Sequence, residues 1–115
     1  MRRGDVCLVD LEPAVGSEAS KRRPSVIVSN DRANAAAERL GRGVVTVVPI
    51  TSSVARIFPF QVLVPAGSSG LHVDSKAQAE QVRSIAVECI GPSLGHLPAT
   101  IMDELDHALR LHLQL

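Results

Sequence analysis

Residues 44–50, VVTVVPI, form the most strongly β-forming stretch of the chain. Its valines, threonine and isoleucine are branched at the β-carbon, and such side chains pack well on a pleated sheet. Pro49 has no amide hydrogen to donate to a sheet ladder, so it predicts an edge strand or a bulge near the end of the stretch. The stretch therefore places a strong strand in the middle of the sequence.

Further strands are expected on both sides of this stretch. Most are short apolar runs bounded by turn-forming residues. The run at residues 76–85, KAQAEQVRSI, also alternates but is unusually polar. The predicted strands cover residues 6–11, 25–29, 60–64, 76–85 and 87–90.

Two helices are expected at the margin of this sheet. Asn30 and Asp31 predict a turn or a helix cap, and the Ala-rich residues 32–40 follow as a short helix. Residues 97–113 predict a C-terminal helix, with Pro98 in its first turn. Its apolar face comprises Ile101, Met102, Leu105, Ala108, Leu109 and Leu113. We therefore expect a mainly β protein of the α+β class, in a single domain of residues 1–115.

Composition limits the function classes. The chain has 115 residues, with 12 Lys and Arg against 12 Asp and Glu, which argues against a general nucleic-acid coat or a membrane-surface binder. The balanced charge does not exclude a local basic site. Cys7 and Cys89 form no Cys-x-x-Cys pair and are expected to be reduced buried thiols. The N-terminus enters a strand pattern directly, so we expect no signal peptide and a cytoplasmic protein.

The densest positive charge precedes the second predicted strand, in SKRRPSVIVS at residues 20–29. Because Arg23 precedes a proline, its backbone is biased towards an extended conformation at the rim of the sheet. A guanidinium in that place offers a planar fork that matches phosphate oxygens. Lys21 and Arg22 are better explained as solvated loop charges or as partners in a surface ion pair with Glu18, whereas for Arg23 we favour a functional role.

Two polar segments complete the candidate site. Thr51, Ser52 and Ser53 follow the strongest strand directly; they fit a simple turn, but near an arginine they also fit a phosphate cradle. In a continuous strand, residues 78–85 would carry polar groups on both faces, which predicts an edge strand or the lining of a polar groove. The four histidines are scattered, and we find no metal-binding or phosphate-loop motif. If the protein is an enzyme, we expect it to need no metal or cofactor.

In this order, the pieces resemble the MazF/PemK toxins of toxin–antitoxin systems. The segments that carry the resemblance are RGDV at residues 3–6, DLEP at 10–13, GSE at 16–18, RRPSVIVSND at 22–31, PITS at 49–52 and EQVRSI at 80–85. Each is weak alone, but together in this spacing they are specific. The resemblance covers nearly the whole chain, including the C-terminal helix.

The resemblance implies an SH3-like β-barrel related to the CcdB gyrase poison, and a homodimer blocked by a cognate antitoxin. It implies an endoribonuclease that cuts single-stranded RNA to leave 2′,3′-cyclic phosphate and 5′-hydroxyl ends. By position, Arg23 and Thr51 are the expected catalytic residues. The expected RNA-binding residues are Gly16, Ser17, Glu18, Lys21, Ser52, Ser53, Glu80, Gln81 and Arg83. The general base is unassigned, with Glu18 and Glu80 as weak candidates.

One departure from the family pattern affects recognition of bases. Relatives often carry an aromatic residue where this chain has Cys7, and only Phe58 and Phe60 are available here to stack on a base. Two other functions stay open at this point. One is a gyrase-poisoning toxin of the same fold, in which Arg23 and Thr51 would be idle. The other is an SH3-like module that grips a peptide or RNA without chemistry.

Overall fold

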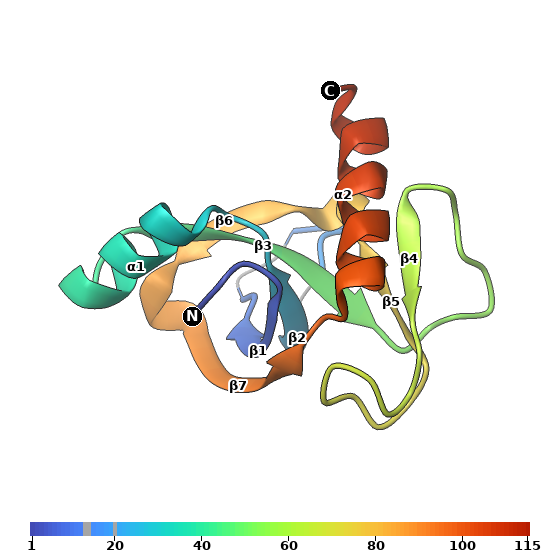
Figure 1. Cartoon of the computed structure of the whole chain (residues 1–115), viewed down its shortest axis with the longest axis horizontal. Coiled ribbons are helices and arrows are strands. Elements are labelled where there is room, and N and C mark those ends of the chain that lie inside the picture. Colours follow the sequence, from blue (N-terminus) through green and yellow to red (C-terminus); the bar gives the residue numbers. More distant parts are fainter. Residues whose placement is uncertain (13–14, 20) are drawn as a thin grey trace.

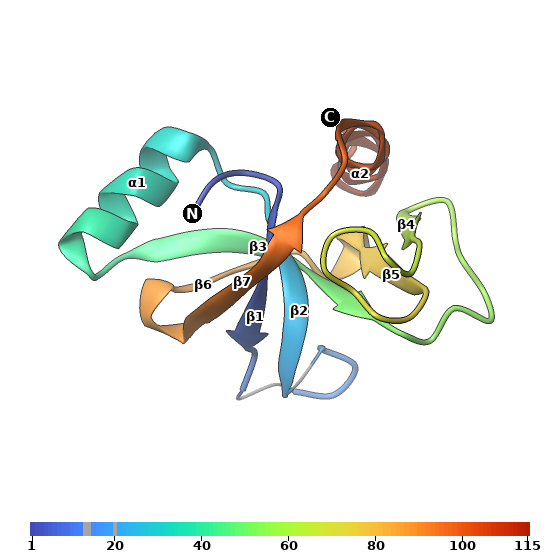
Figure 2. The same cartoon turned by 60° about the horizontal axis from the view of Figure 1, so that its bottom comes forward.

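The computed structural model describes residues 1–12, 15–19 and 21–115, and these form a curved antiparallel sheet with two α-helices (Figures 1 and 2). The strands are β1 (Asp5–Asp10), β2 (Arg22–Ile27), β3 (Val44–Thr51), β4 (Gln61–Val64), β5 (Ser75–Gln78), β6 (Arg83–Ala86) and β7 (Ile90–His96). The α-helices are α1 (Asp31–Leu40) and α2 (Ala99–Leu113), and two 3-10 turns, η1 (Ala79–Gln81) and η2 (Val87–Cys89), flank β6.

Strand β3 is central rather than at an edge, so the edge position suggested by Pro49 was wrong. The sheet order is β4-β5-β3-β2-β1-β7, with β6 also paired to β3. On one side β3 pairs with β2, where Pro49 lies opposite Ser25. On the other side its pairing with β6 ends at Val47 and its pairing with β5 begins at Ile50. Pro49 is tolerated inside the sheet because it lies where β3 changes partner.

The α+β class is confirmed, but the described strands do not close into the expected barrel. The hydrogen-bonded path ends at β4 on one side and β7 on the other. Helix α2 packs against β4 and η1, and so covers this end of the sheet (Figure 1). Pairing of β1 with β7 is also irregular, with register shifts on both sides of Cys7. The result is a strongly curved open sheet.

The polar segment at residues 76–85 is not one strand. It divides into β5, the 3-10 turn η1 and β6, and the two strands pair with different parts of β3. The alternation of faces expected through residues 78–85 was therefore wrong. The last predicted strand was also misplaced, because residues 87–89 form η2 and β7 begins only at Ile90.

Strand β2 begins at Arg22, three residues earlier than predicted, so Arg22 and Arg23 belong to the strand itself. Helix α1 agrees with the prediction: the Asn30 side chain accepts a hydrogen bond from the Ala33 amide at 2.8 Å, and Gly41 ends the helix in the left-handed conformation. Pro98 immediately precedes α2 instead of lying in its first turn. None of the described helices is long and apolar enough to span a bilayer.

Two hydrophobic clusters lie on opposite faces of the sheet. Val26 and Val48 belong to the first, together with Leu105 and Ala108 of α2. Their sequence neighbours Ile27 and Val47 belong to the second, which includes Ala37 of α1. This division follows from the alternation of side chains along β2 and β3. Of the expected α2 face, Leu113 is 49% exposed and joins neither cluster.

The cysteines agree with expectation in part. Both are free thiols; Cys7 is buried in the second cluster, whereas Cys89 is only half-buried beside it. Burial raises the pKa of the Cys7 thiol. Cys7 therefore fills a position in the core, which accounts for a small residue at this point of β1.

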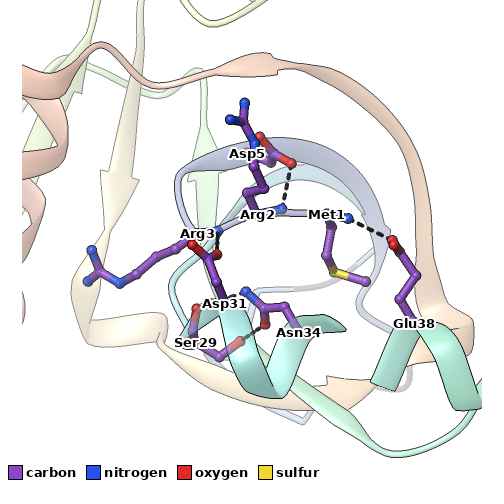
Figure 3. Close-up of polar contacts among 8 residues, drawn as sticks. All are labelled: Met1, Arg2, Arg3, Asp5, Ser29, Asp31, Asn34 and Glu38. Carbon is purple, nitrogen blue, oxygen red and sulfur yellow. Dashed lines mark hydrogen bonds and ion pairs between the residues drawn. The ribbon is translucent and has the colours of Figure 1, made fainter. Parts of the chain in front are cut away.

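Polar contacts fix the start of β1 against α1 (Figure 3). The Arg3 amide donates to Asp31 Oδ1 at 2.6 Å, and the Arg2 amide donates to Asp5 Oδ2 at 2.7 Å. The Met1 amine lies 2.7 Å from Glu38 Oε2. Desolvation opposes ionisation of Asp5, but hydrogen bonds from His96 and the Arg2 amide outweigh it and lower its pKa. These contacts hold the end of the β1–β2 pair that is remote from Arg22.

Candidate active site

A pocket of about 620 Å³ lies where β2 begins and β3 ends, facing the loop between β4 and β5. The lining residues come from these three segments and from one residue each of β5 and β7. They are Lys21, Arg22, Arg23, Pro24, Ile50, Thr51, Ser52, Ser53, Gly70, Leu71, His72, Val73, Ser75 and Leu94. The structure therefore brings together both expected catalytic residues and three of the expected RNA-binding residues.

Sheet register explains why Arg23 and Thr51 share this pocket. The β2–β3 pairing runs from Ile27 opposite Val47 to Ser25 opposite Pro49. Continuing the same antiparallel register by two residues places Arg23 across from Thr51, and residues directly opposite one another share a face. Arg23 is half-buried and is held on its other side by pairing with Val9. Its guanidinium therefore starts from a rigid backbone position.

The hydroxyl segment after β3 forms a turn and lines the pocket at the same time. The Ser53 amide donates to Thr51 Oγ1 at 3.3 Å, which fixes the direction of the chain as it leaves the strand. Thr51 also pairs with Lys76 of β5. Both sequence interpretations of this segment, a turn and part of a polar cradle, are thus compatible.

The loop at residues 65–74 forms the opposite wall, and sequence reasoning did not assign it to the site. Gly70 adopts a φ of +77°, and a β-carbon there would lie 1.9 Å from the Leu94 carbonyl oxygen. At Gly95 a β-carbon would lie 2.6 Å from the Ser69 carbonyl carbon. Only glycines allow the loop to lie this close to β7, which brings His72 to the pocket. The one sequence signal was Gly70, two residues before His72.

Positive charge dominates the pocket. Three lining residues carry it, Lys21, Arg22 and Arg23, and the described lining includes no carboxylate. Lys21 has a φ of +69°, and its amide donates to Glu12 Oε1 at 2.7 Å. Guanidinium and ammonium groups beside hydroxyls suit an anionic ligand with several oxygens, such as a phosphodiester.

The remaining predicted RNA-binding residues lie outside this pocket, and all except Glu80 belong to the loop between β1 and β2 or hold it in place. Gln81 Oε1 accepts from the Ala19 amide at 2.9 Å, and Gln81 Nε2 donates to the Ser17 carbonyl oxygen at 3.0 Å. Arg83 lies 3.7 Å from Glu18 Oε2 and donates to the Leu11 carbonyl oxygen at 3.4 Å. Gly16, in the same loop, is exposed with a φ of +59°. η1 and β6 thus support the loop between β1 and β2.

Neither weak candidate for the general base faces Arg23 in the pocket. Glu18 pairs with Arg83, and Glu80 accepts a hydrogen bond from Gln61 Nε2 of β4 at 2.7 Å. The two phenylalanines also lie apart from the pocket lining. Phe58 and Phe60 stack on each other at 5.4 Å between ring centroids, and Arg56 lies 4.7 Å from the Phe58 centroid. Among the described residues, no cluster of three metal-binding side chains occurs.

Replacing Gln81 with alanine is expected to loosen the loop between β1 and β2. Two hydrogen bonds are lost, each with a net value of about 1 kcal/mol. Amide hydrogen exchange at Ala19 should become faster, whereas exchange in β3 stays slow. Exposed Glu88 provides a control, because Glu88→Ala lies in η2 and should leave Ala19 unchanged. Unchanged exchange in Gln81→Ala would show that the loop does not depend on this contact.

Comparison with known proteins agrees with these features. The family model described as "PemK-like, MazF-like toxin of type II toxin-antitoxin system" matches residues 2–113. The chain is 60% identical over 115 residues to endoribonuclease MazF9 of Mycobacterium tuberculosis, covering 100% of this chain and 98% of that protein. It is 34% identical over 116 residues to endoribonuclease EndoA of Bacillus subtilis, covering 100% and 96% of the two chains.

Solved structures give the same fold. MazF from Deinococcus radiodurans aligns with a TM-score of 0.77 and 26% identity, covering 100% of this chain and 97% of that one. A mycobacterial endoribonuclease in complex with its cognate antitoxin aligns with a TM-score of 0.78 and 23% identity, covering 100% and 96%. The family model, the relatives that match over the whole chain and the fold all agree. This chain belongs to the PemK-like, MazF-like toxins of type II toxin–antitoxin systems.

Proposed function

We propose that this toxin cuts single-stranded RNA in the pocket formed by Arg23 and Thr51. Membership of the toxin family and 60% identity to an endoribonuclease over the whole chain support the activity. The observation that carries the location is the pocket itself, because it joins a half-buried arginine, three hydroxyls and two further cations. The protein is therefore an endoribonuclease whose site is built for a phosphodiester.

The proposed chemistry uses the nucleophile that RNA itself supplies. The 2′-hydroxyl attacks the adjacent phosphorus, the bond to the 5′-oxygen breaks, and the products carry a 2′,3′-cyclic phosphate and a 5′-hydroxyl. Negative charge grows on the non-bridging oxygens in the transition state. Arg23 donates its planar fork to those oxygens, and Thr51 donates a further hydrogen bond. Such preorganised donors are commonly worth about 3 kcal/mol each.

RNA binding is proposed to extend from the pocket to the loop between β1 and β2. Lys21, Ser52 and Ser53 hold phosphates next to the scissile one, since they line the same pocket. The outer contacts comprise Gly16, Ser17, Glu18, Glu80, Gln81 and Arg83. Five of these six residues form or support the loop after β1, so they act on the substrate partly by holding that loop in position, whereas Glu80 accepts a hydrogen bond from Gln61 of β4.

The assembly and setting are proposed from the family and from the similar structures. A cognate antitoxin binds this toxin and blocks its RNA site, as a partner complex is known for the mycobacterial endoribonuclease of the same fold. The toxin acts as a homodimer in the cytoplasm, and residues 1–115 form one toxin domain. Cleavage needs no metal or cofactor, because the substrate carries its nucleophile and the pocket carries the compensating charge.

The decisive experiment is cleavage of a long, mostly single-stranded RNA by the purified toxin in excess EDTA. We expect discrete cuts, mapped by primer extension, with 5′-hydroxyl ends that polynucleotide kinase labels without prior phosphatase treatment. Toxin incubated with its antitoxin is the matched control and should leave the RNA intact. Intact RNA with folded, antitoxin-free toxin would contradict the proposal. Inhibition of gyrase supercoiling in that case would favour a topoisomerase poison instead.

A further inference from the structure

The proposed reaction needs a group that removes the proton of the 2′-hydroxyl, and the described pocket contains few choices. Arg22 and Arg23 stay protonated and are poor bases. A lysine ammonium offers no acceptor for a proton, and the serine and threonine hydroxyls are far too weak as bases. The described lining includes no aspartate or glutamate. Among the described lining residues, His72 is left as the one histidine, the residue type used most often as a general base.

The carboxylates suggested by the sequence are held elsewhere. Glu18 pairs with Arg83 beside the loop after β1. Glu80 is bound to Gln61 on β4, on the side where α2 packs. Neither lines the pocket. Both are therefore already engaged in contacts that support neighbouring segments.

The loop that carries His72 is held by its own hydrogen bonds. The Gly67 amide donates to the Leu71 carbonyl oxygen at 2.9 Å, and the Leu71 amide donates to the Ser68 carbonyl oxygen at 3.0 Å. The Leu71 side chain is 7% exposed and joins the first hydrophobic cluster. His72 follows this anchor directly and is itself exposed at the pocket. Catalytic residues commonly lie on loops that a rigid scaffold positions, and the buried Leu71 fixes this loop next to His72.

The charged groups around His72 come from two segments. Lys21, Arg22 and Arg23 line the same pocket from β2 and the residue before it. Asp74 lies two residues along the loop, and its Oδ1 accepts the Ala66 amide at 2.8 Å. Asp74 thus closes the base of the loop.

We propose that His72 is the general base of the cleavage reaction, an inference that rests on the proposed function. Its neutral imidazole takes the 2′-hydroxyl proton as the 2′-oxygen forms its bond to phosphorus. The bond from phosphorus to the 5′-oxygen breaks, and the departing oxygen takes a proton from water. The imidazolium then loses its proton to the hydroxide so formed, which restores both groups. Arg23 and Thr51 stabilise the phosphate throughout.

The test compares His72→Gln with His107→Gln in single-turnover cleavage between about pH 5.5 and 8.5. General-base catalysis contributes about 10²–10⁴-fold, so His72→Gln should slow cleavage by at least about 10²-fold. The wild-type rate should rise with pH, because only a neutral imidazole can accept the proton, and the variant should lose that rise. Added free imidazole should restore part of the rate. His107 is exposed on α2, away from the pocket, and its variant should match wild type.

A binding measurement separates catalysis from positioning. An RNA with 2′-deoxy residues cannot be cut, and His72→Gln should bind it within about twofold of wild type while cleaving the normal RNA slowly. A loss of affinity equal to the loss of rate, or an unchanged rate and pH profile, would overturn the role of His72. Wild-type toxin that cuts no RNA would instead overturn the proposed function, and this inference with it.

Discussion

Replacing Arg23 with alanine is expected to abolish RNA cleavage and to leave a folded dimer. The guanidinium is the charged group held most rigidly in the pocket, because Arg23 is half-buried in β2 and paired with Val9. Loss of one preorganised donor to a charged transition state lowers the rate by about 10²–10³-fold. Arg23→Ala removes both hydrogen-bond donors that the guanidinium offers to the phosphate, so the loss of cleavage rate should lie at or beyond the upper end of that range.

Three variants define the result. Arg23→Lys keeps the charge but not the planar fork, so its single-turnover rate should lie between those of Arg23→Ala and wild type. Arg32→Ala removes an exposed arginine in the first turn of α1 and should cut at the wild-type rate. Circular dichroism and thermal melting report the fold of each variant. Cuts at the same positions and at the same rate in Arg23→Ala would remove this residue from the mechanism.

Replacing Gly70 with alanine is expected to displace the loop at residues 65–74 and so to disrupt the pocket. A β-carbon at Gly70 would lie 1.9 Å from the Leu94 carbonyl oxygen, and backbone cannot move aside as a flexible side chain does. The left-handed φ of +77° adds about 1–2 kcal/mol for any residue with a β-carbon. Displacement of pocket groups by about 1 Å can lower the rate by about 10²-fold.

Gly67 provides a matched control in the same loop. Its φ is +83°, but a β-carbon there would meet nothing within 4 Å. Gly67→Ala should therefore show only the backbone penalty, a loss of about 1–2 kcal/mol in the free energy of unfolding, with cleavage close to wild type. Gly70→Ala should lose more stability in urea titration, and most of its activity. Equal losses in the two variants would show that the contact with β7 does not position the pocket.

Local sequence patterns correctly predicted the elements that are determined by short-range effects. Residues 44–50 are β-branched and form most of β3, and the Asn30 cap with the following alanines gives α1. Arg23 and Thr51 could be selected together because each adjoins a strongly predicted strand. Antiparallel pairing of β2 and β3 then brings those strand ends to one place.

The polar segment at residues 76–85 could not be assigned from its alternation. Its first part pairs with the end of β3 and its last part with the beginning of β3, and the 3-10 turn η1 connects the two. A strand partner far away in the sequence decides this division. The same long-range pairing places Pro49 inside the sheet, at the point where β3 changes partner.

The sequence by itself thus determined β3, the two helices and the choice of Arg23 and Thr51 as candidates, because β-branching, helix capping and the bias before proline act over a few residues. Tertiary structure alone decided which acids and bases face the pocket. Glu80 accepts a hydrogen bond from Gln61 beside η1. His72 lines the pocket because Gly70 and Gly95 allow the loop at residues 65–74 and β7 to approach closely. Such contacts join residues that lie far apart in the chain, so local sequence patterns cannot predict them.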